Sequence, residues 1–220
     1  MQKIIEKLKV NNLLSETVKK ELASFWQYCV EPVSDPKLKD ALVYFLEETA
    51  PLGFFVNPAS SSGKTHLRWQ RGEGGILRNT TECCLALNQQ LRIYPQFTDK
   101  NYNVLPQHRD IILIATILSD TFKYGDEILA ASTKKSKMIP EHGAVAAEKW
   151  RAVAEKFAIL PSTADKIYNA TYWHLGRWTP GWTPETKFDL YTGIVHRLDM
   201  MFADKNLESL YNPKETIGQK

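Results

Sequence analysis

The sequence predicts an all-α fold, and three observations carry this prediction. Apolar residues recur three and four positions apart along most of the 220 residues, which is the period of an amphipathic helix. Clusters of proline and glycine separate these periodic segments. Alternation of apolar and polar residues, the pattern of a strand, is confined to residues 91–94. The hydrophobic content of 43% and the charged content of 24% are typical of a globular protein, and the length suits one well-buried domain.

Three helices are predicted within the first 50 residues. The first has one apolar face, formed by Ile4, Ile5, Leu8 and Val10. The second begins after Ser15, whose hydroxyl suits a helix N-cap, and extends to Cys29. The third begins at Asp35-Pro36, a capping residue followed by a proline that suits the first helical position. Its apolar face contains Leu38, Leu42, Phe45 and Leu46.

Five further helices are predicted in the rest of the chain. Residues 51–75 first form a long irregular stretch rich in glycine, proline and serine, and loops of this length are usually functional or disordered. Helices follow at residues 76–91, 110–124, 140–157, 162–174 and 187–202, with Ser162 capping the fourth. Residues 110–124 are almost all apolar, which places this helix at the domain centre. We therefore expect an N-terminal helical extension at 1–50, a domain at 51–205 and a C-terminal tail at 206–220.

The composition argues against several classes of protein. A net charge of +3 is too small to indicate nucleic-acid or membrane binding by itself. The first 14 residues carry charges throughout, and no stretch approaches the roughly 18 apolar residues that a membrane span requires. The three cysteines lack a CxxC spacing, and Cys83 and Cys84 are adjacent, so we expect reduced thiols. The sequence thus predicts a cytoplasmic protein without a membrane partner.

Four polar residues stand out against this apolar background. Asp120 follows the apolar run at 111–118, where an unpaired buried carboxylate would be costly. His142, His174 and Asp199 lie at the ends of, or inside, other predicted helices. Two carboxylates and two imidazoles from separate helices are able to converge on one divalent metal ion. The simpler interpretation of Asp120 is a helix-end carboxylate paired with Lys123.

Five short segments are informative because of their order along the chain. They are residues 74–80 (GGILRNT), 118–125 (LSDTFKYG), 141–148 (EHGAVAAE), 172–178 (YWHLGRW) and 195–199 (VHRLD). Together they resemble the HD-domain phosphohydrolase superfamily, in particular the HD modules of three-prime exoribonucleases and related phage and bacterial proteins. The resemblance covers about residues 54–204. It implies an HD-domain helical bundle with extra N-terminal helices.

The resemblance also implies a metal site that has lost part of its ligands. Family members hold a primary metal with two histidines and two aspartates, and further histidines bind a second metal where one is present. Asn79 and Ser119 stand at the positions that match the two primary histidines. One divalent ion (Mn, Fe, Zn, Ni or Mg) is therefore expected instead of a pair. Its implied ligands are Asp120, His142, His174 and Asp199.

Two functions stay open at this point. The first is a divergent metal-dependent phosphohydrolase that acts on a nucleotide, another phosphoester or a nucleic-acid end, with Asp120 and Lys123 as catalytic residues. The substrate-binding residues implied for it are His66, Arg68, Asn79, Lys123 and Arg177. The second is an HD-like domain that has lost catalysis and binds nucleotides or nucleic acid or has a structural role, because neutral oxygen donors bind transition metals more weakly than imidazole. Either function is compatible with an oligomer.

Overall fold

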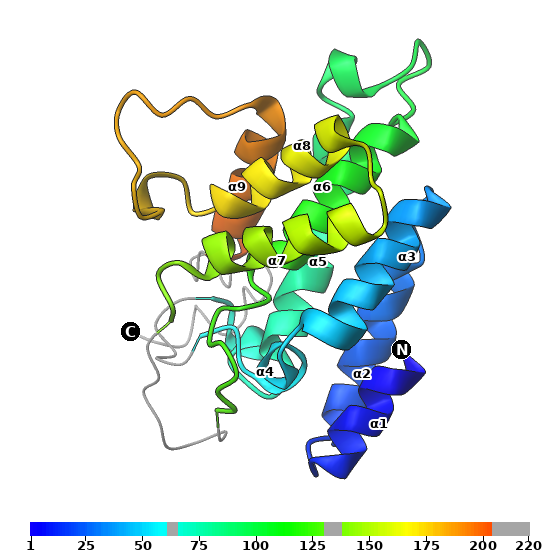
Figure 1. Cartoon of the computed structure of the whole chain (residues 1–220), viewed down its shortest axis with the longest axis vertical. Helices are drawn as coiled ribbons and strands as arrows, with labels where there is room; N and C mark the ends of the chain where they lie inside the picture. The colour runs from blue at the N-terminus through cyan, green and yellow to red at the C-terminus, as the bar shows by residue number, and fades with distance from the viewer. Residues whose placement is uncertain (61–65, 130–137, 204–220) are drawn as a thin grey trace, which may run out of the picture.

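The computed structural model describes residues 1–60, 66–129 and 138–203. The all-α prediction is confirmed, because these residues form nine α-helices and no sheet (Figure 1). The one β-bridge described joins Thr98 and Val104. The predicted tail at 206–220 lies outside the described residues, as do Lys64 and Thr65 of the irregular stretch.

The N-terminal helices begin where the capping residues predict. They are α1 (Gln2–Val10), α2 (Glu16–Phe25) and α3 (Pro36–Tyr44), and α2 and α3 each continue into a π-helical turn. The Ser15 side chain accepts a hydrogen bond from the Val18 backbone N–H, and the Asp35 carboxylate accepts two from the first turn of α3. The placement of Val10 on the apolar face is wrong, since its side chain is 82% exposed. Val10 lies about 200° around the helix from Leu8, which is buried.

Six further helices follow, and α6 lies at the centre of them. They are α4 (Leu52–Val56), α5 (Gly75–Leu91), α6 (Pro106–Ser119), α7 (His142–Lys156), α8 (Pro161–Tyr172) and α9 (Leu190–Ala203). Helix α6 contacts α5, α7, α8 and α9, and each residue from Asp110 to Ser119 is buried. Helices α7 and α8 form an antiparallel pair that crosses in front of α6 in Figure 1. The apolar segment therefore occupies the centre of the fold, as expected.

Several predicted boundaries are corrected by the structure. The strand at 91–94 is absent, because Leu91 ends α5 and the next two residues turn. The central helix begins at Pro106 and ends at Ser119, short of the predicted residue 124. Helix α8 has Pro161 at its first position, so Ser162 is not its cap. Helix α9 begins at Leu190 because the Asp189 carboxylate accepts a hydrogen bond from the Thr192 N–H.

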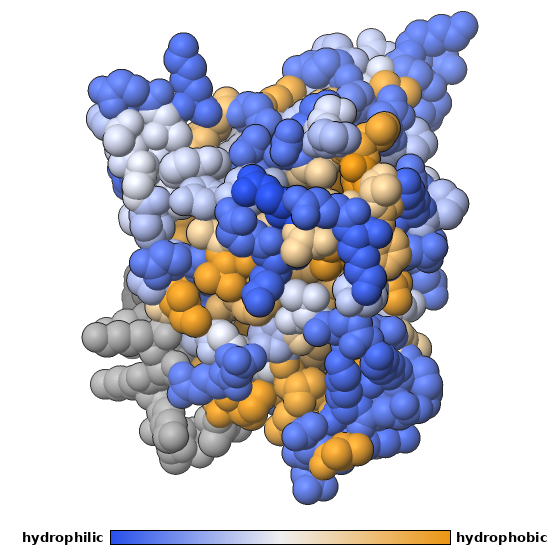
Figure 2. Space-filling view, in the orientation of Figure 1, coloured by the Kyte–Doolittle hydropathy of each residue, from blue (hydrophilic) through white to orange (hydrophobic). Residues whose placement is uncertain are grey.

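One continuous cluster of buried apolar side chains runs from Ile4 in α1 to Phe202 in α9, so the N-terminal helices share the core of the remaining helices. Most of the face shown in Figure 2 is hydrophilic, and the apolar side chains visible on it form small patches. None of the helices in the described ranges is both long and apolar enough to cross a membrane.

Removing the Asp110 carboxylate is expected to destabilise the protein by about 2 kcal/mol. This buried carboxylate accepts hydrogen bonds from the backbone N–H groups of Ser34 and Asp35, at 2.8 and 2.9 Å, and so joins α6 to the start of α3. Asp110→Ala leaves these donors without their acceptor, at a cost of roughly 1–3 kcal/mol. Urea unfolding measures the loss, with Asp40→Ala on the exposed side of α3 as the control that changes stability by less than about 0.5 kcal/mol. Equal effects of the two substitutions would contradict the prediction.

Candidate metal centre

The first component of the site is a buried ion pair at the end of α6. Asp120 is the C-cap residue of α6, and the chain turns there, so that the Lys123 N–H donates to the Asp120 carbonyl. The Lys123 ammonium donates a hydrogen bond of 2.8 Å to Asp120 Oδ2. Both side chains are buried. The local pairing of Asp120 with Lys123 is therefore present, and the other carboxylate oxygen remains for further partners.

The second component is a pair of histidines carried by α7 and α8. His142 is the first residue of α7, and His174 follows the last turn of α8. Their Nδ1 atoms lie 2.6 Å from the Ile139 carbonyl oxygen and 2.8 Å from the Thr171 carbonyl oxygen. The His174 ring packs against Gly143, which only a glycine allows, because a Cβ at position 143 would lie 2.7 Å from His174 Nδ1.

These backbone contacts determine which ring nitrogens carry protons. A carbonyl oxygen only accepts hydrogen bonds, so Nδ1 is protonated in both histidines. The two Nε2 atoms then face each other at 3.0 Å, and His142 Nε2 lies 3.4 Å from Asp120 Oδ1. In two neutral rings the Nε2 lone pairs would repel each other. The contact needs either an additional proton on one Nε2 or a cation that both nitrogens bind.

The donor set fits a divalent transition metal. Asp120, His142 and His174 each offer one ligand atom, and these atoms lie within 4.8 Å of one another. Ligands bound at about 2.0–2.2 Å from one ion are separated by roughly 3.0–3.5 Å. The two separations that involve His142 Nε2, to His174 Nε2 and to Asp120 Oδ1, are 3.0 and 3.4 Å. Metal-binding histidines commonly donate their other ring N–H to a backbone carbonyl, as both rings do here. One carboxylate and two imidazoles suit Mn, Fe, Ni or Zn better than Mg.

The charges of the ion pair stabilise each other despite burial. Burial raises the pKa of Asp120, but the Lys123 charge and the His142 ring outweigh it, so this pKa lies well below 3.8. Burial lowers the pKa of Lys123, but the Asp120 and Asp199 carboxylates raise it above 10.5. Asp120 is therefore a carboxylate and Lys123 an ammonium over the physiological range. Burial, with the neighbouring His142, lowers the pKa of His174 to about 3, so this ring is neutral and its Nε2 lone pair is available.

Asp199 on α9 lies near this cluster but is not among the three residues with converging donor atoms. Burial, together with the Asp120 charge, raises the pKa of Asp199 to about 7. Its assignment as a fourth metal ligand stays a prediction. His196, three positions before Asp199 on α9, donates its Nδ1–H to the His174 carbonyl at 2.6 Å, and the described contacts include no hydrogen bond between His196 and Asp199.

Two further residues of the predicted substrate site approach the ion pair. His66 Nε2 accepts a hydrogen bond of 3.2 Å from Lys123, and its backbone is left-handed, with φ of 66°. Burial and the Lys123 charge lower the pKa of His66 to about 4, so the ring is neutral. Its Nδ1 and the neighbouring Asn79 Oδ1 are both buried, and neither has a hydrogen bond of good geometry within the described residues. A buried donor and a buried acceptor beside the ion pair are polar groups that a bound ligand or water would satisfy.

The other predicted residues lie elsewhere. Arg68 and Arg177 are on the surface, and the Arg177 guanidinium covers the Trp178 ring at 4.6 Å. Ser119 is buried, but its hydroxyl donates to the Thr116 carbonyl within α6. The sequence interpretation missed His196, which holds the backbone at His174. No local pattern marks this role, because it depends on the packing of α9 against the turn after α8.

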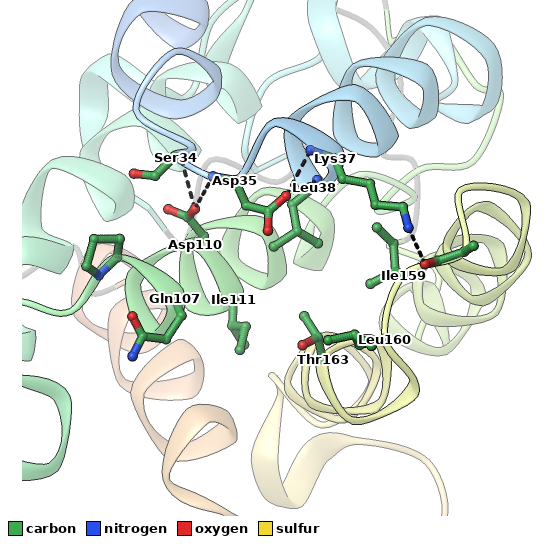
Figure 3. Close-up of a pocket in the computed structure, with 12 residues that line it drawn as sticks. Ser34, Asp35, Lys37, Leu38, Gln107, Asp110, Ile111, Ile159, Leu160 and Thr163 are labelled. Atoms are coloured by element: carbon green, nitrogen blue, oxygen red, sulfur yellow. Dashed lines mark hydrogen bonds between the residues drawn. The ribbon is translucent and has the colours of Figure 1, made fainter.

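A separate cavity of about 650 Å³ lies at the other end of α6 (Figure 3). The starts of α3, α6 and α8 surround it, and Asp110 and Asp120 lie about 15 Å apart along the helix axis. Its charged side chains are already paired: Asp110 with the backbone at Ser34 and Asp35, Asp35 with the first turn of α3, and Lys37 with the Ala158 carbonyl at 2.6 Å (Figure 3). These contacts hold helices together and do not extend the metal centre.

No protein family, curated protein or solved structure matches this chain.

Proposed function

We propose that this protein is a metal-dependent phosphohydrolase of the HD type that uses a single divalent ion held by Asp120, His142 and His174. The observation that carries the proposal is the facing pair of Nε2 atoms beside Asp120 Oδ1, at 3.0 and 3.4 Å. A backbone carbonyl orients each ring at Nδ1, which is the arrangement common in metal-binding histidines. Three protein ligands leave open positions for water and substrate.

The bound ion would supply Lewis-acid catalysis toward a phosphoester. The residues of this chain have separate roles beside it. Asp120 accepts a hydrogen bond from Lys123 at Oδ2, and its Oδ1, next to His142 Nε2, would hold the ion. Lys123 supplies a fixed positive charge that favours an anionic phosphate. His66 Nε2 accepts a hydrogen bond from the Lys123 ammonium and so helps to orient it.

The alternative function, an HD-like domain that binds a metal or a ligand without catalysis, is favoured by one observation. Asp120, His142 and His174 are at most 2% exposed, so a substrate reaches them only where the surrounding chain gives access.

Hydrolysis of a model phosphodiester separates the two functions. We expect protein loaded with Mn²⁺ to hydrolyse bis(p-nitrophenyl) phosphate, and Asp120→Asn to lower the rate at least 100-fold, because it loses a charged ligand and the partner of Lys123. Chelator treatment followed by Mn²⁺ addition should abolish and then restore the rate. Metal binding without hydrolysis would favour the non-catalytic function, and absence of metal binding would overturn the proposed site.

A gain-of-function variant tests whether Asn79 and Ser119 limit catalysis. The double substitution Asn79→His and Ser119→His supplies the two imidazoles that the resemblance implies. If the parent is inactive and this variant gains metal-dependent hydrolysis, the protein is an HD-like domain that has lost catalysis. Since Ser119 is buried, the folding of the variant is checked first by thermal unfolding.

A further inference from the structure

A second cavity, of about 380 Å³, is lined by residues of α5, of the 3-10 turn Arg68–Gln70 and of the end of α9. Its apolar lining consists of Leu67, Leu85, Ala86 and Phe202. The polar residues that line it are Trp69, Glu82 and Gln89, and Glu82 is the one charged residue among the lining residues in the described part of the chain. The cavity thus combines apolar walls with a single negative charge.

The hydrogen-bond donors described for the Glu82 carboxylate are all neutral. Trp69 Nε1–H donates to Oε1 at 2.8 Å, and the Gln70 side-chain amide donates to Oε2. Arg78, whose charge lowers the pKa of Glu82, forms its ion pair with Glu21 at 2.7 Å. Among the described residues no lysine or arginine is within ion-pair distance of Glu82. Burial raises the pKa of Glu82 above 4.5, as expected for a carboxylate without a cation beside it.

The two neutral donors fix the carboxylate and leave it further capacity to accept. Each carboxylate oxygen can accept two hydrogen bonds, and each of these oxygens has one described donor. A ligand that carries both a positive charge and an apolar body would pair with this carboxylate and cover the leucine, alanine and phenylalanine side chains. Aromatic rings such as Trp69 and Phe202 are also favourable neighbours for an ammonium group.

We propose that this cavity binds a small amphipathic organic cation, an ammonium group attached to an apolar body, with Glu82 as the counter-charge. The geometry selects against anions, because the carboxylate would repel them. It also selects against neutral apolar molecules, which would leave the carboxylate unpaired. The site is independent of the proposed metal-dependent function, although Leu67 in its wall directly follows His66 of the metal centre.

A pair of probes that differ only in charge tests the proposal on the full-length protein. Phenethylamine is an ammonium ion at pH 7, and 2-phenylethanol has the same size and shape without the charge. We expect isothermal titration to show at least tenfold tighter binding of the amine. Glu82→Gln keeps the size and hydrogen bonds of the side chain and should reduce this preference to less than threefold. Glu155→Gln, an exposed acid on α7, changes the net charge equally and should leave the preference unchanged.

A second variant tests the same proposal if Glu82→Gln fails to fold. Leu85 is 53% exposed, so Leu85→Lys introduces an ammonium into the cavity wall at little cost to folding. This tethered cation should compete with phenethylamine and weaken its binding at least tenfold. Equal binding of the two probes by the unmodified protein, no binding of either probe, or an unchanged preference in both variants would overturn the proposal.

Discussion

Replacing His174 with alanine is expected to abolish most of the stabilisation that Mn²⁺, Ni²⁺ or Zn²⁺ gives the protein. A ligand that binds only the folded state at 100 times its dissociation constant stabilises it by about 2.7 kcal/mol. For a chain of this length such a change raises Tm by roughly 5–10 °C. The substitution removes one of three ligands and leaves the His142 Nε2 without its facing nitrogen. Thermal unfolding in chelator and in each metal measures the metal-induced rise in Tm.

The matched control is a histidine outside the cluster. His108 on α6 pairs with the Tyr191 hydroxyl at 2.7 Å, so His108→Ala removes an imidazole and one contact without touching the cluster. The His108→Ala substitution should lower Tm in the presence of chelator but leave the metal-induced rise in Tm unchanged. If His174→Ala keeps this rise as well, the metal binds elsewhere, and the facing nitrogens are joined by a shared proton instead of a metal ion.

The fold was predictable because its signals are local. The apolar face of α1, the Ser15 and Asp35 caps and the apolar run of α6 each act within one helix, and each is present in the structure. The errors are also local, and they occur where two signals compete. Pro161 and Ser162 are both good starting residues for α8, and the proline occupies the first helical position.

The candidate site was only partly predictable, because its chemistry depends on contacts between helices. The sequence indicates that Asp120, His142 and His174 are polar residues in apolar surroundings. It does not indicate that two backbone carbonyls fix the ring protons, since those contacts depend on the turns that precede α7 and follow α8. The same holds for His196, whose partner is a carbonyl oxygen 22 positions away. Side-chain identity predicted the donor set, and tertiary packing determined its protonation.

Replacing Lys123 with methionine is expected to destabilise the metal-free protein by about 3–5 kcal/mol, which is typical when one partner of a buried ion pair is removed. The methionine keeps the length and apolar stem of the lysine but leaves the Asp120 carboxylate without its ammonium. Urea unfolding in chelator measures the loss. The double variant Asp120→Asn with Lys123→Met should be more stable than Lys123→Met alone, because it buries no uncompensated charge. Additive effects of the two single substitutions would contradict a direct ion pair.

The metal-induced rise in Tm of Lys123→Met tests how the Lys123 ammonium and a divalent ion share the Asp120 carboxylate. In the unmodified protein the Lys123 charge already neutralises Asp120, so a divalent ion at the other carboxylate oxygen gains only part of that attraction. In Lys123→Met the whole carboxylate charge is available to the ion. We therefore expect a larger metal-induced rise in Tm for this variant than for the unmodified protein, measured as the difference between saturating Mn²⁺ and chelator. A smaller rise would mean that the ammonium organises the metal ligands more than it competes with the ion for Asp120.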